Sequence, residues 1–342
     1  MNSPLEAPEP DFGHLVHMSD MRGTFEHALF TQPRPEHGYC SDDMARVLVV
    51  ATREPGRTQV VRDLTTLSLE FLLNALDVQG RCRNRMNRVG AWEDRPDLND
   101  SWGRTIWGLG TAASHSDERL IRYLATKGLE RAMRQRSPWP RAMAFAALGA
   151  AEVLSVDPDN MSARALLSDS ADEMTALGPS FAWPWPEQRL TYANATLTEA
   201  MIAAGSALER PALLQHGLEL LEWLLVRETE HGHLSVTPDG GSGPSDEGPG
   251  FDQQPIEAAA LADACARAGK LDGNPRWTDG ITVAANWFLG DNDSGVLMWD
   301  PTTGGAFDGL EEDGANLNQG TESTLALLST LQHARSLVSV QQ

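Results

Sequence analysis

Cysteine is scarce in this chain, and long apolar runs are missing. Three cysteines, Cys40, Cys82 and Cys265, occur among 342 residues, too few and too far apart for a disulfide framework or a zinc site with short ligand spacing. No run approaches the roughly 18 apolar residues of a membrane helix, and residues 1–15 lack the basic and apolar regions of a signal peptide. We therefore expect a cytoplasmic protein that does not associate with a membrane.

Basic residues are also few. The 27 Lys and Arg residues stand against 48 Asp and Glu residues, for a formal net charge of −21. This balance argues against a nucleic-acid partner, because neutralising phosphates requires clustered cations. An acidic surface mainly promotes solubility, whereas acidic residues gathered in one pocket carry chemistry.

Helical periodicity dominates the chain, and β-branched alternating runs are nearly absent. Residues 58–77 and 117–136 each carry one apolar stripe, as amphipathic helices on a core do. Residues 141–154 and 257–268 are small and apolar nearly all round, which is typical of helices packed on several sides. The chain therefore contains two populations of helix, and they alternate.

This alternation predicts the fold. The low-polarity, inner helices are expected at 42–52, 101–113, 140–154, 190–207, 255–268 and 321–334, and the amphipathic, outer helices at 58–77, 117–136, 160–177, 211–229 and 275–289. A weaker sixth outer helix, interrupted by Gly23, is expected within 11–30. A weak repeat at the inner-helix starts recurs about every 40 to 65 residues, which indicates stacked helix hairpins. We predict an all-α protein with a single (α/α)6 barrel over 11–337, a disordered tail at 1–10 and a C-terminal tail at 338–342.

The starts of the inner helices should converge on one mouth of such a barrel, and their side chains are mostly carboxylates and amides. Both types are natural partners of sugar hydroxyls, which donate and accept hydrogen bonds. The candidate substrate-binding residues at this mouth are His37, Tyr39, Asp42, Arg104, Arg141, Tyr192, Asn194, Asp252, Gln253, Gln254, Asn318 and Gln319.

Tryptophan is concentrated on the same predicted face. A flat indole can cover the apolar face of a pyranose while its N–H binds a hydroxyl. The alternative is that tryptophans flanked by proline only pin long loops to the rim of the barrel. Six of the ten tryptophans lie in long loops or at inner-helix starts: Trp92, Trp102, Trp139, Trp183, Trp185 and Trp299.

Four carboxylates are candidates for catalysis, since glycoside cleavage needs a carboxylic acid and a second carboxylate. Glu257 and Glu322 lie in the first turn or two of otherwise apolar helices, where an unpaired carboxylate is costly unless it faces a wet cavity. Burial would also raise the pKa of such a group toward that of a general acid. Asp43 and Asp100 are first-turn acids that could instead complement a helix dipole, and Glu322 could belong to a capping box.

Other chemistries find less support. His231 and His233 lie beside a Gly-rich stretch with no cysteine nearby, so we expect no metal and no cofactor. The stretch 240–250 contains acidic residues that would repel phosphate, and no GxSxG motif marks a nucleophilic serine.

The segments HGYCSDDMAR, DLNDSWGR, FDQQPIEAAAL and GAFDGLEEDGANLNQGTESTLALL resemble proteins of the six-hairpin glycosidase superfamily, in particular a bacterial group found beside or fused to glycosyltransferases. The resemblance spans residues 14–337 and implies the fold, while the superfamily includes hydrolases, phosphorylases, epimerases and lyases. It also implies an inverting mechanism, with carboxyl groups roughly 6.5 to 9.5 Å apart. The acid-plus-aromatic signatures of unsaturated uronyl hydrolases are not evident here. The positions that the resemblance carries over are Asp42, Asp43, Asp100, Gln254, Glu257, Asn318, Gln319 and Glu322.

The resulting hypothesis is a glycoside hydrolase that cleaves a short oligosaccharide. Glu257 or Glu322 would be the acid, and Asp43 or Asp100 the base. A phosphorylase would need a basic pocket, for which arginines are available at the mouth, and an epimerase would need a histidine pair there. The alternative from another class is a non-catalytic module that binds glycans or partners a glycosyltransferase. The oligomeric state stays open.

Overall fold

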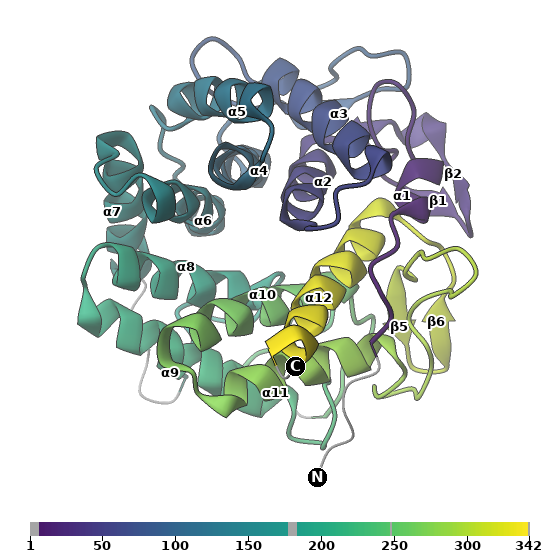
Figure 1. Ribbon diagram of the computed structural model, residues 1–342. Coiled ribbons are helices and arrows are strands. Elements are labelled where there is room, and N and C mark those ends of the chain that lie inside the picture. Colours follow the sequence, from purple (N-terminus) through teal and green to yellow (C-terminus); the bar gives the residue numbers. More distant parts are fainter. Residues whose placement is uncertain (1–6, 177–182, 247, 341–342) are drawn as a thin grey trace.

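The computed structural model describes residues 7–176, 183–246 and 248–340, which form a ring of helices around one axis (Figure 1). The predicted residues 1–6 of the N-terminal tail and 341–342 of the C-terminal tail lie outside this range. The α-helices are α1 Gly13–His17, α2 Ser41–Arg53, α3 Gln59–Ala75, α4 Asp100–His115, α5 Arg119–Ala132, α6 Pro140–Val156, α7 Met161–Ala176, α8 Asn194–Ala207, α9 Pro211–Glu228, α10 Pro255–Asp272, α11 Pro275–Phe288 and α12 Thr321–Val340.

The even-numbered helices α2 to α12 form the inner ring, and α3, α5, α7, α9 and α11 cover them from outside (Figure 1). The predicted (α/α)6 barrel is thus confirmed, with the two helix populations in the predicted alternation. The inner helices are buried nearly all round; in α10, for example, the five residues from Ala258 to Ala262 are each at most 7% exposed. Helix α12 continues to Val340, three residues past the predicted domain boundary.

The helix expected within 11–30 forms only over the five residues of α1. The rest of that segment leads into the antiparallel hairpin of β1 (Ala28–Leu29) and β2 (Gln32–Pro33). A Cβ at Gly23 would lie 3.2 Å from the Tyr39 ring and 3.3 Å from the Phe71 ring, so the backbone packs directly on aromatic side chains there. In place of a sixth long outer helix, this segment therefore packs on the barrel as a short helix followed by extended chain.

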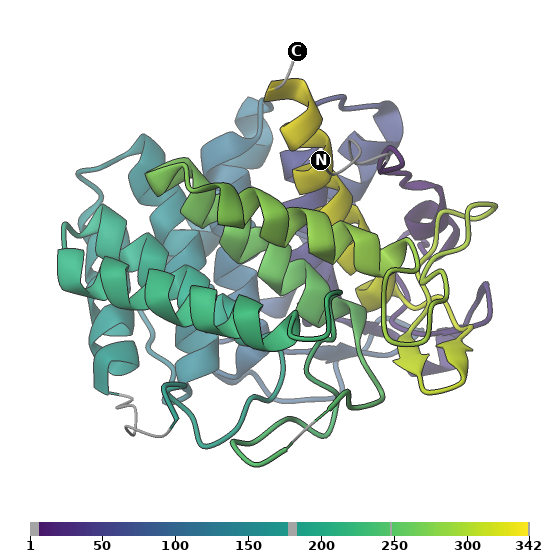
Figure 2. The same cartoon turned by 90° about the horizontal axis from the view of Figure 1, so that it is seen from below.

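Two further antiparallel hairpins lie in the loops. Strand β3 (Tyr39–Cys40) pairs with β4 (Arg85–Met86), and β5 (Gly309–Glu311) pairs with β6 (Gly314–Asn316); the short 3-10 helix η1 (Pro35–His37) precedes β3. The long connections 76–99, 229–254 and 289–320 all lead from an outer to an inner helix. They gather at the end of the barrel opposite the C-terminus of α12 (Figure 2), so the predicted mouth exists.

Helix boundaries follow local chemistry. Thr58 caps α3 by accepting a hydrogen bond from the Val61 N–H, and Asn274 caps α11 in the same way through the Arg276 N–H. Helices α6, α9, α10 and α11 begin with proline, which lacks the N–H that a first helical position leaves unbonded anyway. In the described ranges, no helix is both long and apolar enough to cross a bilayer.

Glycines bring α4 and α6 into backbone contact. A Cβ at Gly149 would lie 2.2 Å from the Ile106 carbonyl oxygen, and one at Gly103 would lie 2.2 Å from that of Ala142. Such distances are too short for any side chain, so this part of the inner ring depends on residues without a Cβ.

Gly149→Ala should therefore lower the free energy of unfolding, by about 1 to 3 kcal/mol, because the added methyl group forces two backbones apart. Denaturant unfolding measures the change. Gly240→Ala is the control, since its Cβ would meet no atom within 4 Å. Equal stability of the two variants would contradict the close packing of α4 on α6.

Candidate active site

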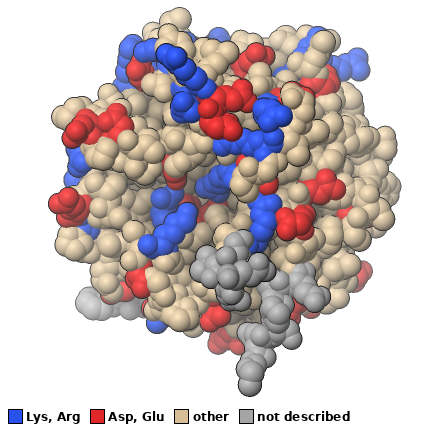
Figure 3. Space-filling model, in the orientation of Figure 1, with Lys and Arg blue, Asp and Glu red and all other residues tan. Residues whose placement is uncertain are grey.

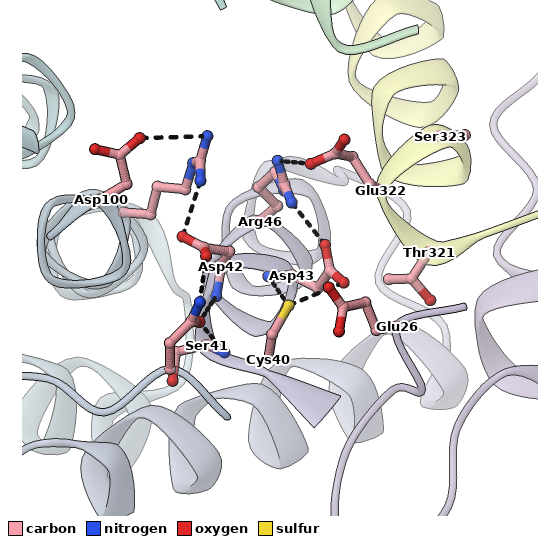
Figure 4. Close-up of polar contacts among 12 residues, drawn as sticks. Glu26, Cys40, Ser41, Asp42, Asp43, Arg46, Asp100, Thr321, Glu322 and Ser323 are labelled. Carbon is pink, nitrogen blue, oxygen red and sulfur yellow. Dashed lines mark hydrogen bonds and ion pairs between the residues drawn. The ribbon is translucent and has the colours of Figure 1, made fainter. Parts of the chain in front are cut away.

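The start of α2 carries the first two acidic residues of the site. Cys40 precedes the helix, where its sulfur accepts a hydrogen bond from the Asp43 N–H and its thiol donates to Asp43 Oδ2 at 3.1 Å. Asp42 and Asp43 point to opposite sides of α2, each toward a different arginine (Figure 4).

Arg46 joins Asp43 to α12. Its Nη2 donates to Asp43 Oδ1 at 2.6 Å, and its Nη1 forms an ion pair with Glu322 Oε2 at 2.7 Å without the alignment of a hydrogen bond (Figure 4). Asp308 lies close to both carboxylates and accepts hydrogen bonds from the Gly320 N–H and from Ser323 Oγ. We call Asp43, Asp308 and Glu322 the carboxyl cluster.

Arg104 organises the other side of α2. Its Nη1 donates to Asp42 Oδ1 at 2.8 Å, and its Nη2 lies 3.9 Å from Asp100 Oδ2. Asn84 Nδ2 donates to the second oxygen of Asp42, and the Tyr192 hydroxyl donates to Asp100 Oδ2 at 2.6 Å. We call Asp42 and Asp100 the Arg104 pair.

The two groups differ in their affinity for protons. Burial raises the pKa of Asp43, with Arg46 opposing and Glu322 adding to the shift. Burial likewise raises the pKa of Asp308 to about 6, against its hydrogen bonds, with Glu322 and Asp43 adding to the rise. Burial would also raise the pKa of Asp42, but the charges of Arg104 and Arg46 outweigh it and hold that pKa below its usual value. The carboxyl cluster therefore retains a proton at a pH where Asp42 is ionised.

Between these two groups a cavity runs along the barrel axis, with an empty volume of about 480 Å³ including its opening. Trp107 and Phe145 form an aromatic wall, and Nε of Arg46 and Nε of Arg104 have no partner among the described residues. The residues lining this axial cavity come from all six inner helices or their caps: Arg46, Val49, Val50, Arg104, Trp107, Phe145, Ala193, Thr196, Ile256, Ala259, Ala260, Asp263, Glu322, Leu325, Ala326 and Ser329.

Glu257 lies apart from both groups. Its carboxylate accepts hydrogen bonds from the backbone N–H groups of Ala193 and Asn194 and from Asn194 Nδ2. These donors belong to the start of α8, where Ala193 adopts a left-handed conformation with φ 45°. Burial raises the pKa of Glu257 to about 7, although these hydrogen bonds and Arg141 oppose the rise. The carboxylate therefore serves as the cap of a neighbouring helix.

Three of the predicted substrate-binding tryptophans have no free face. Trp102 is fully buried and donates its indole N–H to the Ala132 carbonyl oxygen. Trp183 and Trp185 are 8% and 1% exposed and pack against Trp223. The prediction that these three indoles cover a sugar is corrected here, because each is part of the core.

Trp92 and Trp139 differ from these. Trp92 is half-buried, with its ring edge-on to Phe71. Trp139 is 57% exposed at the start of α6. Of the six tryptophans on the predicted face, Trp139 is the most exposed.

Several predicted binding residues are occupied within the protein. Tyr39 is buried and donates to Asp20, Gln319 binds Thr303 and Asp300, and Gln253 ties Trp287 to Asp293. These three side chains are buried, and their polar atoms are bonded to other residues of the protein. In this structure they therefore do not contact a ligand directly.

The remaining predicted positions lie at the rim. Arg141 pairs with Glu187 and stacks on the Tyr192 ring, with its Cζ 4.6 Å from the centroid. Asn318 accepts a hydrogen bond from the Phe30 N–H, and Gln254 precedes α10. Burial raises the pKa of Asp252 to about 6, and its Oδ1 has no partner among the described residues.

A histidine pair also lies at the mouth. The rings of His27 and His37 are 5.0 Å apart, edge to face, and His27 Nε2 is 3.7 Å from Glu26 Oε1. Burial and the neighbouring His37 lower the pKa of His27, although Asp43 and Glu322 oppose the shift.

Glu26, Cys40 and Asp43 place three potential metal ligands within 4.8 Å of one another. Their chemistry favours protein contacts, because Glu26 already pairs with Arg85 and Asp43 with Arg46. A cation would have to displace two guanidinium groups.

Sequence reasoning missed Arg46, Asp263 and His27 as members of the site. For Arg46 a signal existed: it lies three residues after Asp43, on the same face of one helix, just as Arg104 lies four residues after Asp100. For Asp263 and His27 the sequence offers no comparable spacing, since their partners lie on other segments.

Neither a protein-family model nor a curated protein matches this chain, whereas solved structures match it along most of its length. A cellobiose 2-epimerase from Spirochaeta thermophila has a TM-score of 0.67 at 13% identity, covering 96% of this chain and 93% of its own. A sugar epimerase from a ruminal bacterium has a TM-score of 0.70 at 12% identity, with 95% of each chain covered. The cellulase Cel9M of C. cellulolyticum has a TM-score of 0.60 at 12% identity, covering 92% of this chain and 87% of its own.

These similarities establish that the chain has an (α/α)6-barrel fold. At such low identity they establish the fold alone, because one fold hosts several reactions. The predicted association with glycosyltransferases stays a prediction.

Glu257→Ala should destabilise the protein by about 2 to 4 kcal/mol, because it leaves buried N–H groups of α8 without an acceptor. Denaturant unfolding of this variant and of Glu322→Ala measures the difference. The control should lose much less, since the Glu322 side chain is 41% exposed. A Glu257→Ala protein as stable as the wild type would refute the capping role.

Proposed function

We propose that this protein is a carbohydrate-active enzyme that hydrolyses the glycosidic bond of a short oligosaccharide at the mouth of the barrel. The observation that carries the proposal is the proton asymmetry between Asp43 and Asp308, whose pKa values are raised, and Asp42, whose pKa is lowered. Two carboxyl groups whose surroundings drive their pKa values apart are the usual basis of an acid and base assignment.

Glu322 is the proposed acid. It lines the axial cavity, whereas Asp43 is almost fully buried. Asp43 and Glu322 share the single charge of Arg46, and burial raises the pKa of Asp43 and of Asp308. In this proposal the carboxyl cluster holds a proton that Glu322 passes to the leaving oxygen. The glycosidic bond breaks as that oxygen takes the proton.

Asp100 is the proposed base. Its Oδ2 is held by the Tyr192 hydroxyl and lies near Arg104, while Oδ1 accepts no hydrogen bond from the described residues. That oxygen is free to take a proton from a water that attacks the anomeric carbon. Asp42, fully engaged by Arg104 and Asn84, keeps Arg104 in place.

A second candidate is epimerisation or isomerisation of a sugar, favoured by the pair of His27 and His37. Such a reaction needs one group to remove the proton beside the sugar carbonyl and another to return it. Two solved structures similar to this chain are named as epimerases. We rank this candidate second because Glu322 lines the axial cavity and neither histidine does, although Asp100 does not line it either.

Glu322→Gln and Asp100→Asn should each lower turnover by about 10²- to 10⁴-fold, the usual contribution of a general acid or base. The assay follows product release from α- and β-linked gluco-, manno- and galacto-oligosaccharides, with and without phosphate. Glu130→Gln, a substitution in an exposed ion pair on α5, should retain full activity.

Other outcomes would point elsewhere. Release that requires phosphate would identify a phosphorylase. An unhydrolysed sugar that gains deuterium from D₂O beside its carbonyl, with loss of this exchange in His27→Gln, would identify an epimerase. Saccharide binding without any turnover would favour a non-catalytic module.

The pH profile tests the proton asymmetry. The active form holds the proton of the carboxyl cluster, so kcat/KM should fall above a pKa of about 6, the value for Asp308.

Asp308→Asn removes one negative neighbour from Glu322 and Asp43, so the remaining carboxyl groups should lose their proton more easily. The alkaline limb of the profile should then move to lower pH. A limb that stays in place in this variant would show that another group supplies the proton.

A further inference from the structure

Residues 191–194 form the turn that leads into α8, and we call them the α8 turn. The Thr191 N–H donates to Asn194 Oδ1 at 2.9 Å, and Arg141 on α6 donates to the same oxygen at 3.3 Å. Arg141 also donates to the Tyr192 carbonyl oxygen. A buried guanidinium therefore holds this turn from the side of α6.

Glu257 on α10 holds the same turn with a negative charge. Its Oε1 accepts a hydrogen bond from the Ala193 N–H, and its Oε2 accepts bonds from the Asn194 N–H at 3.1 Å and from Asn194 Nδ2 at 3.0 Å. Ala193 adopts φ 45°, a left-handed conformation that residues with a Cβ rarely take. The two buried charges together fix a backbone shape that the local sequence does not favour.

Tyr192 extends from the α8 turn to the start of α4. Its hydroxyl donates to Asp100 Oδ2 at 2.6 Å, and Arg141 Cζ lies 4.6 Å from the centroid of its ring. Among the described residues, no other side chain donates a hydrogen bond to the Asp100 carboxylate, since Arg104 Nη2 is 3.9 Å away. The orientation of Asp100 therefore depends on Tyr192.

The Tyr192 hydroxyl is a lasting donor in this contact. Burial and the charge of Asp100 raise its pKa, although Arg141 and Arg104 oppose the rise. The hydroxyl thus keeps its proton at neutral pH and donates it to the carboxylate. Tyr192 is also 43% exposed, so the contact lies where solvent and a substrate reach it.

Resting on the hydrolysis proposed above, we propose that Tyr192 is the positioning residue of Asp100, and that Glu257 and Arg141 act on catalysis through Tyr192. The α8 turn places the tyrosine ring, and the hydroxyl holds Asp100 Oδ2. Asp100 Oδ1 is then left for the water: it takes the proton as the water O–H bond breaks, and the water oxygen bonds to the anomeric carbon.

This arrangement connects the base to a large part of the barrel. Asp100 belongs to α4, Arg141 to α6, the α8 turn to α8 and Glu257 to α10. These four helices are successive neighbours in the inner ring (Figure 1). A carboxylate that does not reach the substrate, Glu257, thereby determines where one that does reach it lies.

Kinetics with a substrate that wild type hydrolyses provide the first test. Tyr192→Phe should lower kcat by about 10- to 100-fold, the worth of a hydrogen bond to a charged group. It should leave KM unchanged, because the ring and the backbone contacts of the turn remain. Tyr123→Phe is the matched control: Tyr123 lies on the outer helix α5 and is 59% exposed, so this variant should keep the wild-type kcat.

A second comparison tests the link through the α8 turn. Glu257→Gln keeps one acceptor oxygen and loses the other, so the turn should loosen and kcat should fall. The double variant Tyr192→Phe/Glu257→Gln should lose no more activity than Tyr192→Phe alone, because both changes act through one hydroxyl. Additive losses would overturn the proposed link.

Glu199→Gln is the control for this comparison. Glu199 is also a buried glutamate, but it pairs with Arg267 near the C-terminal end of α10 instead of holding the α8 turn. That end of the barrel is the face drawn in Figure 3, where charged atoms of both signs surround the centre. This variant should keep the wild-type kcat.

Carbon-13 NMR follows the Tyr192 hydroxyl without any substrate. The chain has three tyrosines, so tyrosine labelled at Cζ gives three signals, and Tyr192→Phe identifies the one that matters. This signal should shift in Asp100→Asn and in Glu257→Gln, and it should stay in place in Glu199→Gln. A signal that does not move in Asp100→Asn would overturn the proposal, and this variant carries the test even where Glu257→Gln fails to fold.

The positioning role and the hydrolase fail differently. Loss of hydrolysis in Asp100→Asn with an unchanged kcat in Tyr192→Phe would uphold the hydrolase and overturn the positioning role. A raised KM with an unchanged kcat in Tyr192→Phe would show that the hydroxyl binds substrate, which also overturns that role. Absence of hydrolysis by wild type together with the expected NMR shifts would overturn the hydrolase and uphold the placement of Asp100 by Tyr192.

Discussion

The inner ring of this barrel depends on the pairing of its carboxylates with buried arginines. A carboxylate transferred from water into a helix core costs several kcal/mol unless a positive charge and hydrogen bonds compensate. Arg46 and Arg104 provide that compensation at the mouth, and Arg53 and Arg267 provide it near the C-terminal ends of the inner helices. Each of them links helices that are far apart in the sequence, so the charges also hold the ring together.

The pairing of carboxylates with cations is less complete at the mouth than near the C-terminal ends of the inner helices. At the mouth, two guanidinium groups lie among the five carboxyl groups of the carboxyl cluster and the Arg104 pair. Near the C-terminal ends, two guanidinium groups and two imidazoles pair with three carboxyl groups. Burial raises the pKa of Asp308 at the mouth, and the neighbouring charges of Glu322 and Asp43 add to the rise.

The alternation of inner and outer helices could be predicted because the two kinds of helix differ in their local amino-acid composition. Helices packed on all sides must be small and apolar, and helices on the outside must carry a polar face. The convergence of Asp42, Asp43, Asp100 and Glu322 followed from that architecture alone. Neither conclusion required knowledge of any single side-chain contact.

The role of Glu257 could not be predicted, because its donors lie 63 and 64 residues away on α8. The sequence pattern of an acidic residue at the start of an apolar helix is the same whether its carboxylate faces a cavity or caps a neighbouring helix. Trp102 posed a similar problem. A shift of one position turns a side chain by about 100° around a helix, which is enough to move it from a pocket into the core. Asp263 lay inside a segment that appeared uniformly apolar, so only the structure could place it beside Arg53.

The fold does not choose the reaction, since structures named as epimerases and a cellulase share it with this chain. What differs between such reactions is which group holds a proton next to the bound sugar. In this chain the histidines stand outside the axial cavity, while Glu322 lines it within a cluster whose members compete for one guanidinium. Asp42 on the opposite side of α2 is kept ionised by Arg104, and the same guanidinium lies 3.9 Å from Asp100, the proposed base. A proton source on one side of α2 and an ionised carboxylate beside Arg104 on the other suit the protonation of a leaving oxygen together with the activation of water, which is the chemistry proposed here.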